Sequence, residues 1–439
     1  MRIFDVLSFA AVIAVTQGIS GARAADDVFV PGTETNFGGF YVGAEIAHSI
    51  ANNQIGLSEL DDSITVDGWG ADGISGGMFV GYDHLLDNGF LIGGQIGGHW
   101  SDITSSISYY EPNVIARGQL KTDWLATASA RAGYLVNPET LVFSSIGLTV
   151  AHGVGSYYVD DGGGVLSDSD EEFFYGVALG SLGVETVLGG NLRGRFEYVA
   201  SYLTQQSFTF DDLELDVTPI IGTAKVSLVY GFGAPSPVET VFVNAPESWT
   251  GFFGGLRGGH DMGNTELSVG DPDVGGVFDG FGSNGLMGGG FVGYNHQVGS
   301  RFVVGVEGGV SASTINFEVN ADIGGVAIGR FSVGTEWAAN ARLRAGVLVN
   351  PSTLIFGYGG YSRNHMYGEI SDGGITERET FSVNAYEFGG GVETFVADGV
   401  SVRGEYGISL TENLLEDIDD FGSLKKTGGT GSVAAVFHF

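Results

Sequence analysis

A long internal repeat constrains the fold more than any other feature of this sequence. Four segments recur in the same order: Gly76–His84 as Gly288–His296, Arg131–Leu141 as Arg344–Leu354, Gly183–Thr186 as Gly391–Thr394, and Arg195–Tyr198 as Arg403–Tyr406. The partners lie about 210 residues apart, so the repeating unit is far longer than a solenoid repeat or a propeller blade. The chain therefore contains two copies of one domain.

The repeat divides the chain into copies and connecting segments. We assign residues 37–232 to the first copy and residues 249–439 to the second. Residues 233–248 contain three prolines and are expected to form an extended linker between the copies. A proline-bearing lead, residues 25–36, precedes the first copy.

The first 24 residues have the pattern of a secretory signal peptide. Arg2 gives a positive start, Val6–Val15 is a short apolar stretch, and Ala22-Arg23-Ala24 precedes Ala25 as a small-residue cleavage site. The apolar stretch is shorter than the roughly 20 residues that a membrane-spanning helix needs. We expect residues 1–24 to be removed on export.

Each copy reads as eight strands with one apolar and one polar face. In the segment 123–134, Trp124 and the alanines at even positions lie on one face, whereas Thr127, Ser129 and Arg131 lie on the other. This period of two residues is typical of a half-buried strand. Gly makes up 76 of 439 residues, and glycine is tolerated where strands curve or approach one another closely.

The lengths of the connections indicate which solvent the apolar faces meet. Three connections in the first copy are tight, at residues 87–89, 137–140 and 188–191. The connections between them are long and acidic, at residues 48–75, 153–170 and 203–216. Short turns on one rim and long polar loops on the other are typical of a transmembrane β-barrel, whose tilted strands cross the bilayer in about 10 residues. A soluble all-β protein would have to bury the same faces without lipid.

We therefore predict an all-β fold, a transmembrane antiparallel up-and-down β-barrel. The two copies form either two tandem eight-stranded barrels or one sixteen-stranded barrel. A single large barrel would need a tight turn between strands eight and nine, but the sequence supplies the 16-residue segment 233–248 there. This difference favours two barrels.

If the apolar faces meet lipid, several charged side chains point into the lumen. They are Arg131, Glu185, Arg195 and Glu197 in the first copy, and Glu307, Arg344, Glu393, Arg403 and Glu405 in the second. Charges confined in a barrel of this size must pair, because isolated buried charges are expensive. We interpret them as a structural polar core that fills the lumen; a narrow, cation-tolerant conduit is the alternative.

Composition excludes several other functions. Eighteen basic against 52 acidic residues give a formal net charge of −34, which opposes binding to nucleic acid. The absence of Cys excludes thiolate metal sites and cysteine nucleophiles. The acidic loops match no calcium-loop pattern, and His84 and His296 lie beside turns without a second ligand nearby. We therefore expect no metal, no cofactor and no enzymatic activity.

The opening of the second copy, Trp249-Thr250-Gly251-Phe252-Phe253-Gly254-Gly255, resembles the first strand of the porin-like outer-membrane β-barrel proteins of alphaproteobacteria. These are relatives of the membrane domain of outer-membrane protein A and of the opacity proteins. The segments around Arg131, Glu185 and Arg195, and their second copies, resemble that family's later strands. Most members have one barrel where this chain has two copies, and the first copy has Phe37 in place of the opening Trp.

The resemblance implies an integral protein of the outer membrane of a Gram-negative bacterium. The terminal Phe437 and Phe439 resemble the aromatic signal that the barrel-assembly machinery reads, so periplasmic chaperones, that machinery, outer-membrane lipid and lipopolysaccharide are the expected partners. The expected function is structural or surface-contact, in the cell envelope. The alternatives are a porin for small solutes or ions and an adhesin that acts through its acidic loops. The sequence does not indicate the oligomeric state.

Overall fold

The computed structural model describes residues 33–59, 62–210, 213–238, 242, 245–270, 274–323, 326–372, 375–411 and 423–439. The expected signal peptide and most of the lead lie outside the described residues. Within these ranges, no helix is long and apolar enough to cross a membrane.

The first copy closes into an eight-stranded antiparallel barrel. Its strands are β2 (Gly39–Glu59), β3 (Asp62–Leu85), β4 (Phe90–Glu111), β5 (Val114–Asn137), β6 (Thr140–Asp160), β7 (Val165–Gly189), β8 (Leu192–Leu203), β9 (Gln206–Phe210) and β10 (Leu213–Gly231). From β2 to β8 each strand pairs with the next, and β10 returns to pair with β2 from Tyr41 to Leu57. Both β8 and β9 pair with β10, so together they act as one interrupted strand.

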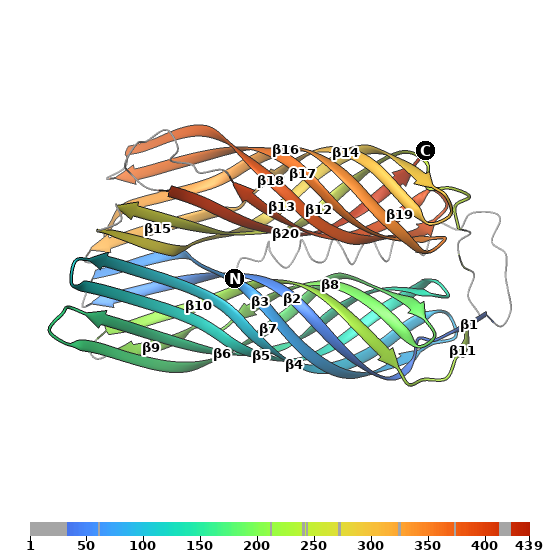
Figure 1. Cartoon of the computed structure of the whole chain (residues 1–439), viewed down its shortest axis with the longest axis horizontal. Coiled ribbons are helices and arrows are strands. Elements are labelled where there is room, and N and C mark those ends of the chain that lie inside the picture. The colour runs from blue at the N-terminus through green and yellow to red at the C-terminus, as the bar shows by residue number, and fades with distance from the viewer. Residues whose placement is uncertain are drawn as a thin grey trace.

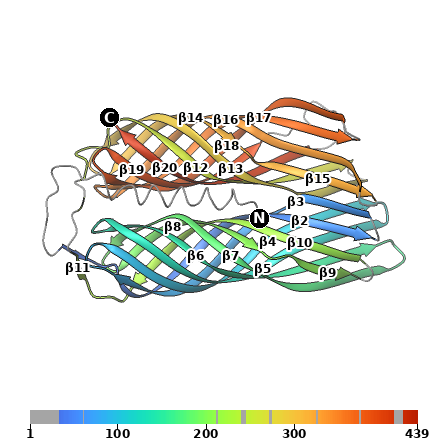
Figure 2. The ribbon, with the colours of Figure 1, turned by 180° about the vertical axis from the view of Figure 1, so that it is seen from behind.

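The second copy closes in the same way. Its strands are β12 (Gly251–Gly270), β13 (Gly275–Val298), β14 (Phe302–Ser313), β15 (Asn316–Ile323), β16 (Val326–Asn350), β17 (Thr353–Asp372), β18 (Ile375–Ala397), β19 (Val400–Thr411) and β20 (Ser423–His438). The barrel closes through β20 and β12, and β14 and β15 both pair with β16. The two barrels lie side by side with their long axes aligned (Figures 1 and 2).

The lead and the linker pair with each other. Their short strands β1 (Thr33–Thr35) and β11 (Ser236–Val238) form a two-stranded sheet at the end of the molecule that carries the short turns (Figure 1). The described part of the linker is therefore tied to the first barrel and is not simply an extended spacer.

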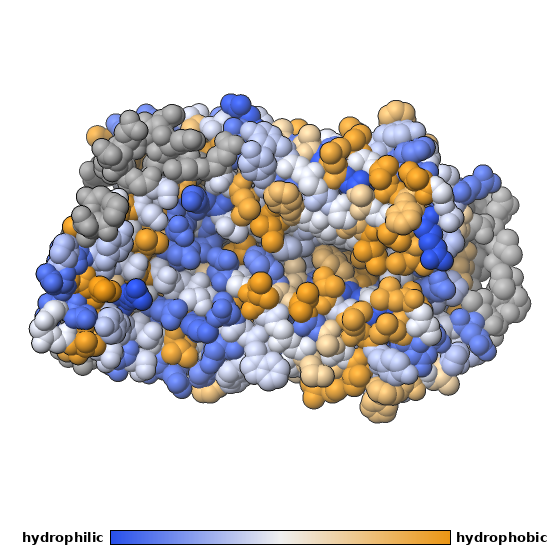
Figure 3. Space-filling model, viewed as in Figure 1, coloured by the Kyte–Doolittle hydropathy of each residue, from blue (hydrophilic) through white to orange (hydrophobic). Residues whose placement is uncertain are grey.

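An apolar belt surrounds the half of the molecule nearest the short turns. Orange residues gather over this half in Figure 3, and hydrophilic residues predominate toward the hairpin tips. On β4 the belt runs from the exposed Phe90 to the exposed Trp100, and on β16 from Val347 to Trp337. About 10 residues of a tilted strand cross a bilayer, so the belt has the height of a membrane.

The long acidic connections expected from the sequence are largely strand. Residues 153–160 belong to β6, and of residues 203–216 only a few lie outside β8, β9 and β10. The uninterrupted strands of the first barrel run 19 to 25 residues, well beyond the membrane. Many of their outward side chains are acidic or polar, whereas inward residues such as Phe174 and Phe208 pack in a buried apolar cluster. The sequence therefore reads as polar loops rather than as lipid-facing strands.

The two barrels join beyond the membrane. Near the turns β3 pairs with β4, from Leu85 to Asp72, but farther out residues 63–67 of β3 pair with β15 of the second barrel. In the same way β13 leaves β14, and its residues 275–279 pair with β4 of the first barrel. Traced through these outer pairings, the strands of both copies form one circuit of sixteen, whereas near the turns they close as two separate eight-stranded barrels.

Candidate functional site: the charged lumens

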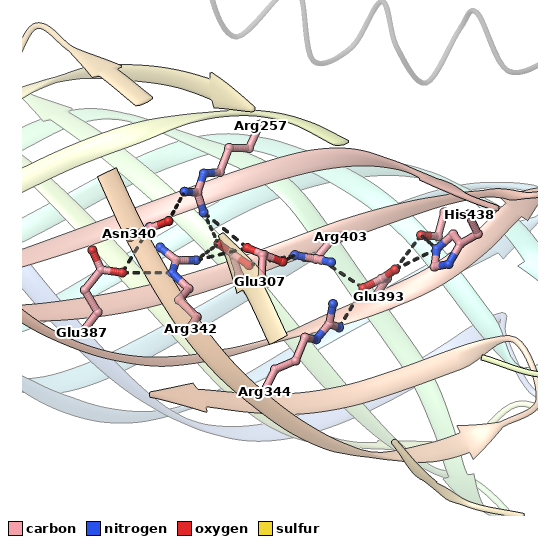
Figure 4. A network of polar contacts seen from close by, with 11 residues as sticks. Arg257, Glu307, Asn340, Arg342, Arg344, Glu387, Glu393, Arg403 and His438 are labelled. Carbon is pink, nitrogen blue, oxygen red and sulfur yellow. Dashed lines mark hydrogen bonds and ion pairs between the residues drawn. The ribbon is translucent and has the colours of Figure 1, made fainter. Parts of the chain in front are cut away.

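The lumen of the second barrel contains a continuous chain of ion pairs (Figure 4). Glu393 on β18 forms its inner end. Its carboxylate accepts from Arg344 at 2.8 Å, from Arg403 at 2.9 Å and from the Ser401 hydroxyl at 2.8 Å. His438 on β20 lies 3.1 Å from the same carboxylate. Every oxygen lone pair of this buried group therefore has a partner nearby.

Arg403 links Glu393 to the next carboxylate of the network. It donates to Glu307 on β14 at 2.6 Å. Two more arginines follow: Arg342 donates to Glu405 at 2.9 Å, and Arg257 lies 3.4 Å from the same carboxylate. The outermost contacts join Arg342 to Glu387 at 2.9 Å and Asn340 to Glu387 at 3.3 Å, as Figure 4 shows.

The first barrel repeats the inner part of this arrangement. Glu185 is fully buried and binds three arginines: Arg131 at 2.7 Å, Arg195 at 2.8 Å and Arg193 at 3.1 Å. Arg131 also holds Asp83 through two hydrogen bonds.

Farther out, a second group surrounds Glu45. His99 and Lys225 both pair with this carboxylate, Lys225 at 3.5 Å, and Ser227 donates to it at 3.1 Å. Glu197 accepts from Ser145 and lies directly opposite Lys225 on the neighbouring strand.

The main charged cluster of each lumen is electrically balanced. The first barrel contains four cations and four carboxylates, which are Arg131, Arg193, Arg195, Lys225, Glu45, Asp83, Glu185 and Glu197. The second also contains four of each, which are Arg257, Arg342, Arg344, Arg403, Glu307, Glu387, Glu393 and Glu405. A buried carboxylate and a buried guanidinium each lose several kcal/mol of solvation, so balance is what such a core requires.

Aromatic rings pack between the guanidinium groups and take the space that water would need. In the second barrel, Arg344 lies 4.2 Å from the centre of the Phe356 ring, and Arg403 lies 4.7 Å from that of Phe291. In the first, Arg195 lies 4.9 Å from the centre of the Phe79 ring. Cation–π contacts of this kind gain strength where the cation is desolvated.

The repeats reach the same balance with different residues. Asp83, Gln95 and Arg193 in the first copy align with Asn295, Glu307 and Ser401 in the second. Glu45 and Ser129 align with Arg257 and Arg342. Charges are lost and gained at individual positions, but the main charged cluster of each lumen stays neutral. Balance of this cluster, rather than any particular pair, is the property that both copies share.

The structure places all nine charged residues named from the sequence in the lumens. Arg131, Glu185 and Arg195 meet in one cluster of the first barrel. Glu197 lies apart from them, bonded to Ser145. In the second barrel the five predicted residues are all in one network: Glu307, Arg344, Glu393, Arg403 and Glu405.

Sequence reasoning missed about half of the network. The missed residues are Glu45, Asp83, Gln95, His99, Arg193 and Lys225 in the first barrel and Arg257, Arg342, Glu387 and His438 in the second. These residues alternate with apolar neighbours along their strands, and this pattern would have indicated that they point into the lumen. Arg342, for example, lies two residues from Arg344 and so on the same face of the strand.

An aromatic residue closes each barrel at the end with the short turns. Phe37 is fully buried with Leu91, Leu135 and Leu141 beneath the first barrel. Trp249 lies in the same place beneath the second barrel, and its indole N–H donates to the Pro351 carbonyl at 3.0 Å.

The outer half of the first lumen is apolar. Ile103, Phe174, Phe208 and Ile221 belong to a buried cluster there, which leaves a cavity of about 30 Å³. This volume holds a water molecule and is well below the roughly 150 Å³ of a cavity that takes benzene.

Several described acidic residues of the outer half are bonded within the protein. The Asp161 carboxylate accepts from the amides of Gly163 and Gly164, which lowers the pKa of this carboxyl. At the junction of the barrels, Asn264 donates to both Asp72 and Asp279, at 2.8 and 2.9 Å.

Burial, together with the charges of Asp72 and Glu266, raises the pKa of Asp279. The part of the chain that the structure describes contains no group of three or more metal-ligating side chains, and His84 and His296 are exposed on the barrel wall.

The predicted assembly residues lie at the rim with the short turns. Phe437 is half exposed and Phe439 is 85% exposed. The amide of Phe439 donates to the Phe252 carbonyl at 2.9 Å, which continues the closure between β20 and β12.

Among the comparisons with known proteins, a family model matches the second repeat. Residues 240–437 match the family model of the outer membrane protein beta-barrel domain. The chain is also similar to the 31 kDa outer-membrane immunogenic proteins of Brucella melitensis biotype 1 and Brucella suis biovar 1. Each is 25% identical over 232 residues, which cover 52% of this chain and 95% of the relative.

Solved barrels resemble the chain more distantly. Ail, the attachment invasion locus protein of Yersinia pestis, is 14% identical and covers 43% of this chain and 99% of its own, with a TM-score of 0.24. The Pseudomonas putida toluene transporter TodX is 11% identical and covers 91% of this chain and 89% of its own, with a TM-score of 0.26. Neither superposition carries functional weight at these TM-scores.

Proposed function

This chain is an outer-membrane β-barrel protein of a Gram-negative bacterium, and from that premise we propose that it is a non-conducting structural component of the cell envelope. The observation that carries the proposal is the filling of both lumens by balanced, buried ion pairs. A pore for solutes needs a continuous aqueous path, whereas an eight-stranded barrel is just filled by its side chains.

The arrangement of the network supports a structural role over a conduit. Glu185 and Glu393 are 0% exposed, and each pairs with arginines from two other strands. Moving an ion past them would require breaking buried pairs, each of which costs several kcal/mol to separate. Cross-barrel pairs also tie distant strands together and so maintain their register.

The proposal includes no chemical reaction. The charged residues of the lumens bind each other closely, and the cavity above the first cluster, about 30 Å³, is too small for a substrate.

Ion conductance in a planar lipid bilayer tests the proposal. The refolded mature chain is expected to remain silent or to give small, erratic openings. A matched variant, Arg257→Ala with Glu405→Ala, removes one balanced pair and should raise conductance, which shows that the assay detects an opened lumen. Large, uniform steps from the unaltered protein would instead establish a porin.

Deletion of the gene tests the envelope role directly. Loss of the protein should increase sensitivity to detergents and to bulky antibiotics. Expression of the unaltered protein, which gives no conductance in the bilayer assay, should restore resistance. Unchanged sensitivity, together with loss of binding to a host or matrix surface, would favour the adhesin alternative.

Assembly through the periplasm belongs to the same proposal. The exposed Phe437 and Phe439 at the end of β20 present an aromatic strand end to periplasmic chaperones and the barrel-assembly machinery. Phe439→Ala is expected to reduce the amount of folded protein in the outer membrane. Equal amounts would show that assembly does not depend on this residue.

A further inference from the structure

A groove on the outer extensions of β4, β5 and β6 is separate from the charged lumens. It has a volume of about 660 Å³, within the roughly 300–1,000 Å³ of small-molecule sites. Its polar lining includes Ser106, Ser108, Arg117, Gln119, Ser156 and Tyr158. Hydroxyl, amide and guanidinium groups of this kind bind sugars and phosphates through hydrogen bonds.

The groove opens sideways, toward the surrounding membrane surface. On β6, Leu148 faces lipid and is 66% exposed, and Ser156 and Tyr158 lie on the same face because residues two apart in a strand share a face. Ala151 and Gly153, of opposite parity, contribute to the interior of the barrel.

The groove also lies just outside the membrane. Trp100 marks the outer edge of the apolar belt on β4, and Ser106 lies six residues farther out. At a rise of about 3.3 Å per residue on a tilted strand, this is the height of the headgroup layer of the outer leaflet.

Arg117 is the charged group of the groove, and its charge is uncompensated. It lies directly between Ser108 on β4 and Tyr158 on β6. Among the described residues, the exposed Arg330 and Arg378 pair with Glu318 and Glu336, whereas Arg117 forms no ion pair.

The carboxylates around the groove are engaged with other partners. Asp102 binds Lys121 at 2.8 Å, Glu111 accepts from the Tyr109 hydroxyl at 2.9 Å, and Asp160 accepts from the amide of Gly162 at 3.0 Å. The Arg117 guanidinium is therefore free to bind an anion from outside the protein.

We propose that this groove binds the phosphorylated saccharide of lipopolysaccharide in the surrounding outer leaflet. Arg117 binds a phosphate through two parallel hydrogen bonds, the serines and Gln119 bind sugar hydroxyls, and the Tyr158 ring packs against the apolar face of a sugar. The net charge of −34 repels a free polyanion, but lipopolysaccharide is already held beside the groove by the membrane. This favours a lipid of the same leaflet over a soluble polysaccharide.

Titration of the full mature chain in lipopolysaccharide-free detergent micelles tests the proposal. The probe is the soluble, phosphorylated core oligosaccharide of lipopolysaccharide. Arg117→Gln should weaken binding by about tenfold or more, the loss expected for one charge-assisted contact. Arg117→Lys should weaken it less, Tyr158→Ala should also weaken it, and the matched control Arg330→Gln should leave it unchanged. Circular dichroism checks that each variant is folded.

Three outcomes overturn the proposal. The first is no binding of the core oligosaccharide to the unaltered protein. The second is equal binding to the Arg117→Gln variant or to the dephosphorylated oligosaccharide. The third is Arg117-dependent binding of a soluble uronate polysaccharide with no binding of the core, which would assign the groove to an external ligand. None of these outcomes depends on whether the barrels conduct ions.

Discussion

Tyr198 and Tyr406, which occupy the same position in the two repeats, stack on each other across the boundary between the barrels, with ring centroids 6.2 Å apart. Each hydroxyl bonds a histidine of the opposite barrel: Tyr198 bonds His260 at 2.9 Å and Tyr406 bonds His48 at 2.7 Å. The two histidines are also equivalent in the repeat. The boundary thus has the pattern of an isologous contact between two identical subunits.

The same symmetry extends along the whole boundary. At the rim with the short turns, the equivalent Thr140 and Thr353 bond each other at 3.0 Å. At the outer junction Trp69 on β3 is paired with its equivalent, Phe281 on β13. A two-fold relation between the copies therefore runs from one end of the molecule to the other, although both belong to one chain.

The first prediction concerns the two buried glutamates that pair with several arginines. Glu185→Ala or Glu393→Ala leaves two or three arginines buried without their carboxylate, and should lower the free energy of unfolding by about 3–5 kcal/mol. Urea unfolding of the refolded protein, followed by tryptophan fluorescence, measures the loss. Unchanged resistance to urea in both variants would mean that these carboxylates are hydrated.

The second prediction concerns charge balance. Asp83→Asn and Arg193→Ser each introduce the residue of the second copy and each unbalance the first lumen. Together they restore balance. The double variant should therefore lose less unfolding free energy than the two single variants combined, with a coupling energy of about 0.5–3 kcal/mol. Strictly additive losses in the double-mutant cycle would contradict this explanation.

The third prediction concerns the aromatic closures. Trp249→Ala should lose about 3–5 kcal/mol, as is usual for a buried aromatic residue. Trp249→Phe copies the Phe37 of the first barrel and should lose only about 0.5–1.5 kcal/mol, for the missing hydrogen bond to Pro351. Thermal unfolding measures the stability of the two variants. Equal losses of stability would show that packing of the aromatic ring does not stabilise this end of the barrel.

The fourth prediction concerns the junction outside the membrane. Val66 on β3 and Val319 on β15 are register partners in different barrels. Because the chain has no Cys, Val66→Cys with Val319→Cys should form one disulfide on oxidation, seen as a reducible shift in electrophoresis. The control combines Val66→Cys with Ser156→Cys and should form none. Failure of the first pair would place the two barrels apart at this height.

The fifth prediction concerns pH. The pKa of Asp279 is raised, so its ionisation opposes folding at neutral pH and this opposition disappears as the pH falls through the raised pKa. Asp279→Asn should therefore increase stability at pH 7, and the gain should vanish at a pH below the ordinary carboxyl pKa. Urea midpoints at the two pH values measure this; a gain at low pH alone would give the opposite sign and contradict it.

The sequence predicted the parts of this fold that depend on side-chain alternation. Residues such as Arg131 and Glu393 follow a period of two against apolar neighbours, so their direction could be read without coordinates. Both the barrel class and the inward direction of the charges come from that pattern. Asp83 and Lys225 also alternate with apolar neighbours, but they align with the uncharged Asn295 and Ser432, so the repeat did not single them out.

The junction between the barrels could not be predicted in this way. The pairing of β3 with β15 is made by backbone groups, which every residue carries, so it leaves no periodic trace in the side chains. The close approach there depends on glycine: a Cβ on Gly70 would lie 2.8 Å from the Cα of Gly282. Glycine is so frequent in this chain that these two positions do not stand out.

The exchange of partners by β3 has a consequence for how barrels of different size are related. In this chain, barrel size depends on height: cut near the turns, the sheet closes as two rings of eight, and traced through its outer pairings it closes as a circuit of sixteen. Only two seams, between β3 and β4 and between β13 and β14, separate the arrangements. If both seams opened down to the turns, the same strands would enclose one wide lumen. A duplicated small barrel therefore lies two strand pairings away from a large one.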